Sequence, residues 1–326
     1  MLKQIRTWNG HIFVNSDTIN IGDATNLGLI KGKNENTFYF YGKTFACKMA
    51  DGSVFSHTGI VNDADILCMT LNKAANILYV GCGNYVNQFA IDYENKTFTA
   101  LPVPYFASSR PFTSMRIDRE NFMWFSCTFY GGWNGGYPYH GAVRIDLSNI
   151  INANPVVKEL NWNETPEVSK TSALDVFCNF YVVDYNADAT LCKYSRHPVT
   201  GMLSRDFKIT NNDLKYTKDM KIDVYGNILC LTQDNSGIST LVKVRADNAQ
   251  TIDKIALPAY SYNLATDTFN NVYYSTIWKT YKINGNTAGH LPFQAPQVFD
   301  ENIGANYFNS DPFGFYLDGR FGCTGK

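Results

Sequence analysis

The chain is poor in charge and in long apolar runs. Only 17% of its 326 residues are Asp, Glu, Lys or Arg, against about 25% in typical domains. The 28 basic and 29 acidic residues leave a net charge of −1, which gives no electrostatic reason to bind nucleic acid. No apolar run reaches the 18 or more residues of a spanning helix, so we expect no membrane insertion.

Sequence signals for export and for cysteine cross-linking are also missing. The first residues, Met1 to Trp8, lack the apolar core and cleavage site of a signal peptide. The eight cysteines include no CxxC pair and no Cys/His cluster with zinc spacing. Five of them are expected as buried free thiols in or beside apolar strands, namely Cys68, Cys82, Cys127, Cys192 and Cys230. These features predict synthesis in a reducing cytoplasm, with the virion as a second location, and leave open that some cysteines pair after assembly.

Sequence motifs of catalysis are scarce. The chain has no Gly-rich phosphate loop and no nucleophile elbow. Asp63 and Asp65 precede an expected inner strand and could bind a cation, but a solvated loop start is the favoured interpretation. The histidines are far apart in the sequence, and each is expected to be structural: His11, His57, His140, His197 and His290. We therefore predict no cofactor and no metal site.

What the sequence does contain is a repeated turn, clearest between Lys221 and Leu231. It predicts one short strand, a tight turn over Asp223 to Asn227, and a second apolar strand. Asp favours such a turn because its side chain bonds to backbone two residues on, and Gly226 and Asn227 tolerate positive φ. The four strands of this unit are expected at Asp219 to Asp223, Asn227 to Gln233, Thr240 to Arg245 and Thr251 to Leu257.

Copies of this turn recur along the chain every roughly 40 to 57 residues, the period of a β-propeller blade. The other copies begin at Lys33, Asn72, Asp118, Asp175, Asp267 and Asp311. We predict an all-β fold, a seven-bladed β-propeller formed by a single domain of residues 1–326, with six blades if the Lys33 copy is spurious. Residues from about 1 to 22 are expected to complete the blade begun at about 303–326, because closure removes exposed strand edges.

The recurring Asp-x-x-Gly/Asn-Asn followed by apolar residues resembles the propeller superfamily of NHL repeats, the gluconolactonase family and virginiamycin B lyase. The resemblance covers nearly the whole chain and implies the fold. Enzymes of that superfamily hold a divalent cation at the central channel, and no residue set of this chain is matched to that site. The units differ from WD repeats, since no Trp-Asp dipeptide closes them.

One insertion departs from the repeat plan. Between strands expected at Met123 to Thr128 and Ala142 to Asp146 lies a Gly-rich loop that carries Tyr130, Trp133, Tyr137 and Tyr139. Glycines permit unusual backbone angles, and the aromatic rings supply rigid contact area. Two long connections between units should lie on the same face, one with Tyr105 and Arg110, the other with Trp162. These seven residues are the predicted binding site; the alternative is that the rings cap their own blade.

Two classes of function remain open. The favoured one is a non-enzymatic propeller that binds or assembles, with other proteins of an assembly or a surface glycan as partner. Aromatic residues make up 15% of the chain; they suit packed sheet faces and also interfaces. The lean toward Asn, Lys, Ile, Tyr and Phe suits a viral structural protein, for instance a phage tail or capsid-surface component. The alternative is a divalent-cation-dependent enzyme similar to the lactonases or lyases.

Overall fold

The described part of the chain consists almost entirely of β-strands. The computed structural model describes residues 2–8, 13–20, 27–34, 36–59, 64–83, 85–101, 106–107, 112–118, 120–127, 141–147, 157–159, 169–175, 177–184, 189–196, 203–266, 270–276, 280–285 and 292–300. A short 3-10 turn spans Asn212–Leu214. No helix in these ranges is long and apolar enough to cross a membrane.

Six antiparallel sheets are built on one plan, in which consecutive strands pair in chain order. The first sheet contains β3 (Leu27–Lys31), β4 (Thr37–Tyr41), β5 (Thr44–Lys48) and β6 (Val54–Thr58). The second contains β7 (Ile66–Leu71), β8 (Ile77–Cys82), β9 (Tyr85–Asp92) and β10 (Thr97–Ala100), and the short β11 (Phe106–Ala107) also pairs with β9. The third contains β12 (Phe112–Ile117), β13 (Phe122–Cys127), β14 (Gly141–Asp146) and β15 (Val157–Glu159).

The remaining three sheets repeat this plan. The fourth contains β16 (Ser169–Leu174), β17 (Phe180–Asp184), β18 (Thr190–Arg196) and β19 (Leu203–Thr210). The fifth contains β20 (Thr217–Ile222), β21 (Ile228–Gln233), β22 (Ser239–Val244) and β23 (Thr251–Leu257). The sixth contains β24 (Tyr262–Thr266), β25 (Val272–Ser275), β26 (Thr280–Ile283) and β27 (Gln297–Asp300).

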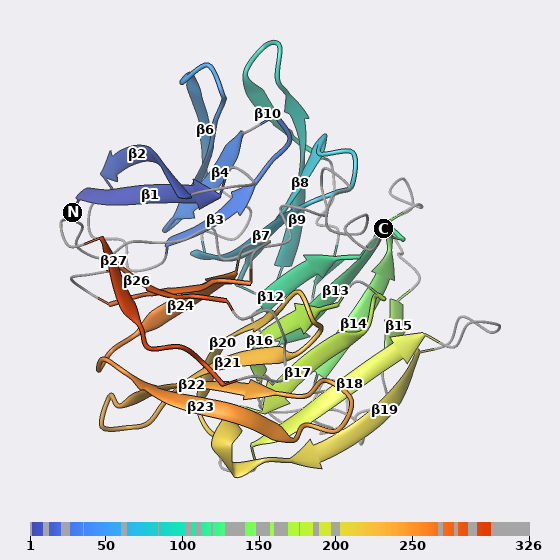
Figure 1. The fold of residues 1–326 in the computed structure, drawn as a ribbon. Helices are drawn as coiled ribbons and strands as arrows, with labels where there is room; N and C mark the ends of the chain where they lie inside the picture. Colours follow the sequence, from blue (N-terminus) through green and yellow to red (C-terminus); the bar gives the residue numbers. More distant parts are fainter. Residues whose placement is uncertain are drawn as a thin grey trace.

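The sheets follow one another around a common axis in chain order (Figure 1). The first strand of each sheet is innermost and packs beside that of the next: β7 beside β12, β12 beside β16, β16 beside β20, and β20 beside β24. A ring of four-stranded antiparallel sheets is the architecture of a β-propeller, so the predicted fold class is confirmed.

A two-stranded hairpin at the start of the chain forms a sheet apart from the other six. Strands β1 (Leu2–Trp8) and β2 (Phe13–Asn20) pair with each other. In the view of Figure 1 this hairpin lies between the first sheet and the sixth, and β1 contacts β3. The expected partner of the hairpin, residues 303–326, lies outside the described residues. The split seventh blade and the single-domain boundaries therefore stay predictions.

The predicted turn is present and has a specific hydrogen-bond pattern. In the fifth sheet the Asp223 N–H donates to the Asn227 carbonyl (2.9 Å), and the Gly226 N–H donates to the Asp223 carbonyl (3.0 Å). The Asp223 Oδ1 accepts from the N–H groups of Tyr225 (2.9 Å) and Asn227 (2.8 Å). Gly226 has φ +82°, as expected for the position that needs a left-handed residue.

The same backbone geometry recurs around the ring. Asp118 and Asp175 make the corresponding N–H to carbonyl pair of hydrogen bonds. The fourth residue of the turn has positive φ in five sheets: Ala75 (56°), Asn121 (66°), Cys178 (64°), Gly226 (82°) and Asn270 (63°). Left-handed geometry at a non-Gly residue costs roughly 1–2 kcal/mol. The side chain at the first position offsets this cost by binding the turn amides.

The second oxygen of each turn carboxylate is also bonded. Asp118 Oδ2 accepts from Trp124 Nε1 (2.9 Å), and Asp175 Oδ2 accepts from Asn179 Nδ2 (2.7 Å) and the Tyr181 hydroxyl (3.0 Å). Asp223 Oδ2 accepts from Asn227 Nδ2 (3.0 Å). These carboxylates therefore hold the inner turns in place.

Strand boundaries in the fifth sheet agree with the prediction to within one residue, except that the inner strand begins at Thr217 instead of Asp219. The cause is a bulge between Thr217 and Asp219 that interrupts the pairing with β21. A bulge adds an unpaired residue to one strand, and it blurs the apolar alternation from which the strand start was inferred.

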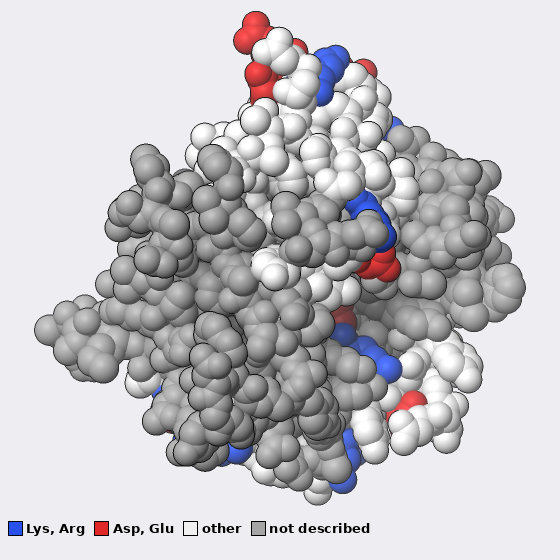
Figure 2. All heavy atoms as spheres, turned by 180° about the vertical axis from the view of Figure 1, so that it is seen from behind, with Lys and Arg blue, Asp and Glu red and all other residues white. Residues whose placement is uncertain are grey.

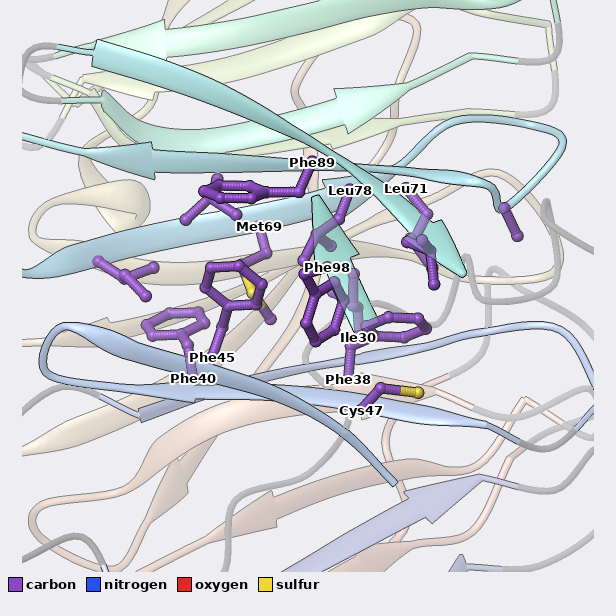
Figure 3. Packing of buried hydrophobic residues seen from close by; sticks show 14 of the residues in the cluster. Ile30, Phe38, Phe40, Phe45, Cys47, Met69, Leu71, Leu78, Phe89 and Phe98 are labelled. Carbon is purple, nitrogen blue, oxygen red and sulfur yellow. The ribbon is translucent and has the colours of Figure 1, made fainter. Parts of the chain in front are cut away.

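Aromatic side chains fill the space between the first and second sheets (Figure 3). The ring of Phe45 lies 4.7 Å from that of Phe89 and 4.8 Å from that of Phe98, measured between centroids. Phe55 also lies 4.6 Å from Phe98. Such ring pairs add about 0.5–1.5 kcal/mol beyond simple burial. For these residues the interpretation of the aromatic content as sheet packing is confirmed.

The cysteines in the described part are buried free thiols: Cys47, Cys68, Cys82, Cys178, Cys192 and Cys230. For Cys68, Cys82, Cys192 and Cys230 the prediction is therefore confirmed, while the side chains of Cys127 and Cys323 lie outside the described residues. Burial raises the pKa of the Cys47 and Cys68 thiols to about 12 and that of Cys82 to about 11. Very little thiolate is present at neutral pH, and thiolate is the reactive form.

We expect these six thiols to resist a maleimide reagent at pH 7.5 in the native protein and to react in 6 M guanidinium chloride. Intact-mass measurement counts the labels. Rapid native labelling of peptides that contain Cys68 or Cys230 would contradict the burial. A mass lower by two hydrogens per pair in unreduced protein would reveal disulfides.

Two matched substitutions test the turn network. Asp118→Asn leaves one side-chain oxygen to accept from both the backbone amides and the Trp124 indole, whose N–H can only donate. We expect this variant to lose about 1–3 kcal/mol in the free energy of unfolding. Asp223→Asn should lower the free energy of unfolding by less, because the side-chain amide of Asn227 can rotate so that its oxygen accepts a hydrogen bond from the new Asn amide. The natural pair Asn72 and Asn76 has this arrangement, with Asn72 Nδ2 donating to Asn76 Oδ1 (2.7 Å).

Burial also raises the pKa of Asp223, which means that the folded protein stabilises its ionised form less well than the unfolded chain does. A neutral Asn at this position removes that penalty. Urea unfolding of both variants and the wild type measures the difference in the free energy of unfolding. An equal loss in the two variants would show that the indole bond is not the distinguishing interaction.

Candidate functional site

The site predicted from the aromatic loops lies outside the described residues. This holds for all seven predicted residues: Tyr105, Arg110, Tyr130, Trp133, Tyr137, Tyr139 and Trp162. Strands that flank these loops are described. Phe112 and Gly141 are both register partners of Cys127, so two of the three loops adjoin neighbouring positions at one end of the third sheet. The site stays a prediction.

Two other candidates from the sequence are only partly described. Asp63 lies outside the described residues, and Asp65 is an exposed residue just before β7. Among the histidines, His57 lies in the described part, where its ring is 5.3 Å from that of Phe45 and 4.9 Å from that of Phe89. His57 therefore belongs to the aromatic packing between the first two sheets. No group of three or more His, Cys, Asp or Glu within the described ranges could hold a metal ion.

A buried charge pair at the inner strands was missed by sequence reasoning. Asp219 on β20 accepts from Lys221 Nζ (2.7 Å) through Oδ1 and from the Leu264 N–H (2.7 Å) through Oδ2. The Thr171 hydroxyl lies 3.5 Å from Oδ1. Lys221 is 1% exposed and Asp219 15%. The sequence signal was a pair of opposite charges two residues apart, which share one face of a strand.

This charge pair connects three sheets at the axis. Thr171 belongs to β16, Asp219 to β20 and Leu264 to β24. The register of β24 shifts between Tyr262 and Leu264, and a bulge leaves a backbone group without a ladder partner. At this register shift the Leu264 N–H donates a hydrogen bond to the Asp219 carboxylate instead. The pair therefore stabilises the packing of neighbouring inner strands.

A pocket of about 490 Å³ lies between the fourth and fifth sheets. It is at the end of the sheets that carries the turns between first and second strands; we refer to this as the inner-turn pocket. Its rim is formed by Phe177 from one turn and by Val224 and Tyr225 from the next. Phe177 is 72% exposed and Tyr225 is 47% exposed. Exposed apolar side chains gathered around a cavity are typical of a binding site.

The deeper lining of the inner-turn pocket is polar and hydrogen-bonded. It includes Asp175, Asn179 and Tyr181, which are linked through Asp175 Oδ2. Burial and the neighbouring Asp175 carboxylate raise the pKa of Tyr181, so its hydroxyl stays protonated at neutral pH. Ile222 adds a buried apolar surface.

Charged side chains at the inner-turn pocket have partners within the protein. Lys193 Nζ lies 3.2 Å from Asp206 Oδ2. Asp247 receives two hydrogen bonds from Arg245, from Nε (3.0 Å) and Nη2 (2.8 Å). The arrangement supports recognition of a ligand by shape and hydrogen bonds. Sequence reasoning missed this pocket because its walls come from two units of the repeat.

Charged side chains are sparse on the described surface seen from one side. On the face seen in Figure 2, much of the described surface is neither acidic nor basic, and acidic and basic side chains lie together inside a hollow near the middle of the molecule. The sparse charge agrees with the composition.

Comparisons with known proteins show the fold alone. No family model and no curated protein matches the chain in sequence. Virginiamycin B lyase from Staphylococcus aureus is similar in structure, with a TM-score of 0.60 and 10% identity over 92% of this chain and 88% of that one. A 6-phosphogluconolactonase-like protein from Bacteroides fragilis has a TM-score of 0.63 and 10% identity over 90% and 88%.

A chain of a mitotic checkpoint complex is similar to the same degree, with a TM-score of 0.61 and 9% identity over 87% of this chain and 85% of that one. The solved structures that share this fold therefore include both enzymes and a component of a protein assembly. The chain is a β-propeller, and the resemblance stated from the repeat is confirmed at the level of the fold.

Proposed function

We propose that this protein is a non-enzymatic recognition propeller, a rigid ring that binds a partner through its loops and turns. The observation that carries the proposal is the contrast at the inner-turn pocket. The carboxylates of Asp175 and Asp223 are occupied by hydrogen bonds of their own turns, while Phe177 and Tyr225 are left at the solvent. The carboxylates thus stabilise the turns, and the exposed apolar side chains are available to contact a partner.

The aromatic loops are the second part of the proposal. We infer that Tyr105, Arg110, Tyr130, Trp133, Tyr137, Tyr139 and Trp162 contact a protein partner. Trp, Tyr and Arg are the residues most often found at interface hot spots. The strand order supports grouping these residues, because Phe112, Cys127 and Gly141, which border two of the loops, are paired neighbours.

A virus particle is the setting that we propose, with the protein as a phage tail or capsid-surface component. Support comes from the composition, which leans toward Asn, Lys, Ile, Tyr and Phe, the residues of AT-rich codons, and from the low charge of 17%. A weakly charged, aromatic surface suits permanent contacts, since charged residues are depleted at the core of interfaces.

The double substitution Trp133→Ala with Tyr137→Ala tests the assembly role. We expect it to abolish co-sedimentation of the full chain with the assembled particle, because hot-spot truncations typically cost 2 kcal/mol or more. The melting temperature should stay close to that of the wild type. Ile238→Ser is the matched control, since Ile238 is an exposed residue in the corresponding connection of the fifth sheet.

Normal co-sedimentation of the double variant would place the contact elsewhere. Loss of cooperative unfolding in the variant would show that the aromatic rings cap their own blade. A wild-type protein that never co-sediments with particles would contradict the viral setting.

A further inference from the structure

We propose that the inner-turn pocket binds a neutral sugar ring, a pyranose unit of a glycan. This assignment rests on the proposed function, since it names the ligand class of a recognition site. The pocket lies between the turns that contain Phe177 and Tyr225. The aromatic loops adjoin the other end of the strands, so this site is separate from the one inferred from the sequence.

The size and rigidity of the pocket suit a small ligand. Its volume of about 490 Å³ falls within the roughly 300–1,000 Å³ of pockets that hold small molecules. The Asp175 and Asp223 carboxylates each bind the backbone amides of their own turn. The Val224 N–H also donates to Asn270 Oδ1 (3.2 Å) on the next turn. The walls are therefore fixed before a ligand arrives, which reduces the entropic cost of binding.

The rim of the pocket has exposed apolar side chains at turn positions whose backbone conformation polar residues could adopt equally well. Phe177 is 72% exposed, and Val224 and Tyr225 are each 47% exposed. A pyranose ring has faces made of C–H groups that can lie against such rings, and covering apolar area gains roughly 25 cal/mol per Å². Two aromatic side chains on neighbouring turns can contact the sugar from adjacent sides.

Charge at the pocket favours an uncharged ligand. Lys193 is paired with Asp206, and Asp247 is paired with Arg245 through two hydrogen bonds. Asp175 accepts four hydrogen bonds from within its own sheet. A charged ligand would lose its hydration on binding, and the charged groups at the pocket are already paired with opposite charges. Burying an unpaired charge in this way is unfavourable.

Hydrogen-bonding capacity remains for a ligand rich in hydroxyl groups. The Asn179 side chain gives an N–H to Asp175, and its amide carbonyl oxygen is an acceptor that can receive a ligand hydroxyl. Lys193 has three N–H groups and one carboxylate partner in Asp206. Sugar hydroxyls both donate and accept, so they can satisfy these groups. An apolar peptide side chain would leave these polar groups buried without hydrogen-bond partners, which is unfavourable.

Saturation-transfer NMR on the full chain tests the assignment, with the methyl glycosides of glucose, galactose, mannose and N-acetylglucosamine as probes. We expect transfer to the C–H protons of at least one glycoside. Phe177→Ser and Tyr225→Ser should each weaken its affinity on the order of tenfold, equivalent to about 1.4 kcal/mol. Phe177 is 72% exposed, so the melting temperature of the Phe177→Ser variant should not change.

Tyr260→Asn is the matched control. Tyr260 is 50% exposed and has φ +57°, and Asn accepts positive φ. It does not line the pocket, so glycoside binding should be unchanged in this variant.

The proposal is overturned if no glycoside shows transfer, or if binding is unchanged in both pocket variants. It is also overturned if peptides selected from a library bind the pocket in a Phe177-dependent way while all four glycosides fail, because the site then docks protein. Failure of glycoside binding with intact co-sedimentation leaves the assembly role standing. A glycoside that binds and is converted to product supports the pocket but contradicts the non-enzymatic function.

Discussion

The hydrogen bonds from backbone amides to the first side chain of each inner turn are the interaction on which the rest of the fold depends. In the third, fourth and fifth sheets that residue is Asp118, Asp175 and Asp223, and in the second it is Asn72. The turn reverses the chain in a few residues, sets the register of the two inner strands, and places a left-handed residue at its fourth position. Each sheet thus forms from local sequence, and the ring assembles from similar units.

This use of acidic residues bears on function. A carboxylate that already accepts three or four hydrogen bonds has little capacity left for a substrate or a cation. Asp219 is in the same situation at the axis, where it binds Lys221 and the Leu264 amide. We therefore place the proposed recognition on side chains exposed at the surface, above all Phe177 and Tyr225.

The sequence predicted the features that depend on neighbouring residues. The Asp-centred turn is local, so its copies at Asp118, Asp175 and Asp223 were found, and the strands on either side followed. The start of β20 was wrong because a bulge changes the alternation at Thr217. Cys68, Cys82, Cys192 and Cys230 are buried, as their apolar surroundings in the sequence indicated.

Features that depend on packing between units could not be predicted in the same way. The inner-turn pocket brings Asn179 and Tyr225 together from different sheets, and no spacing in one unit encodes that approach. The bond from Asp219 to Leu264 also joins two sheets. The aromatic loops, found from their Gly and Tyr content, have flanking strands at the expected places, while their residues stay a prediction.

Hydrogen exchange at the turn amides tests the central claim most directly, namely that the carboxylates hold the turns rigid. The amides of Tyr225 and Asn227 donate to Asp223, and those of Phe177 and Asn179 donate to Asp175. We predict that these amides exchange as slowly as the strand amides of β21, although they lie in surface turns. The Glu94 amide is an internal reference, because it donates to the exposed Asp92 carboxylate (3.0 Å) and should exchange fast. Fast exchange at all of these turn amides would contradict the account.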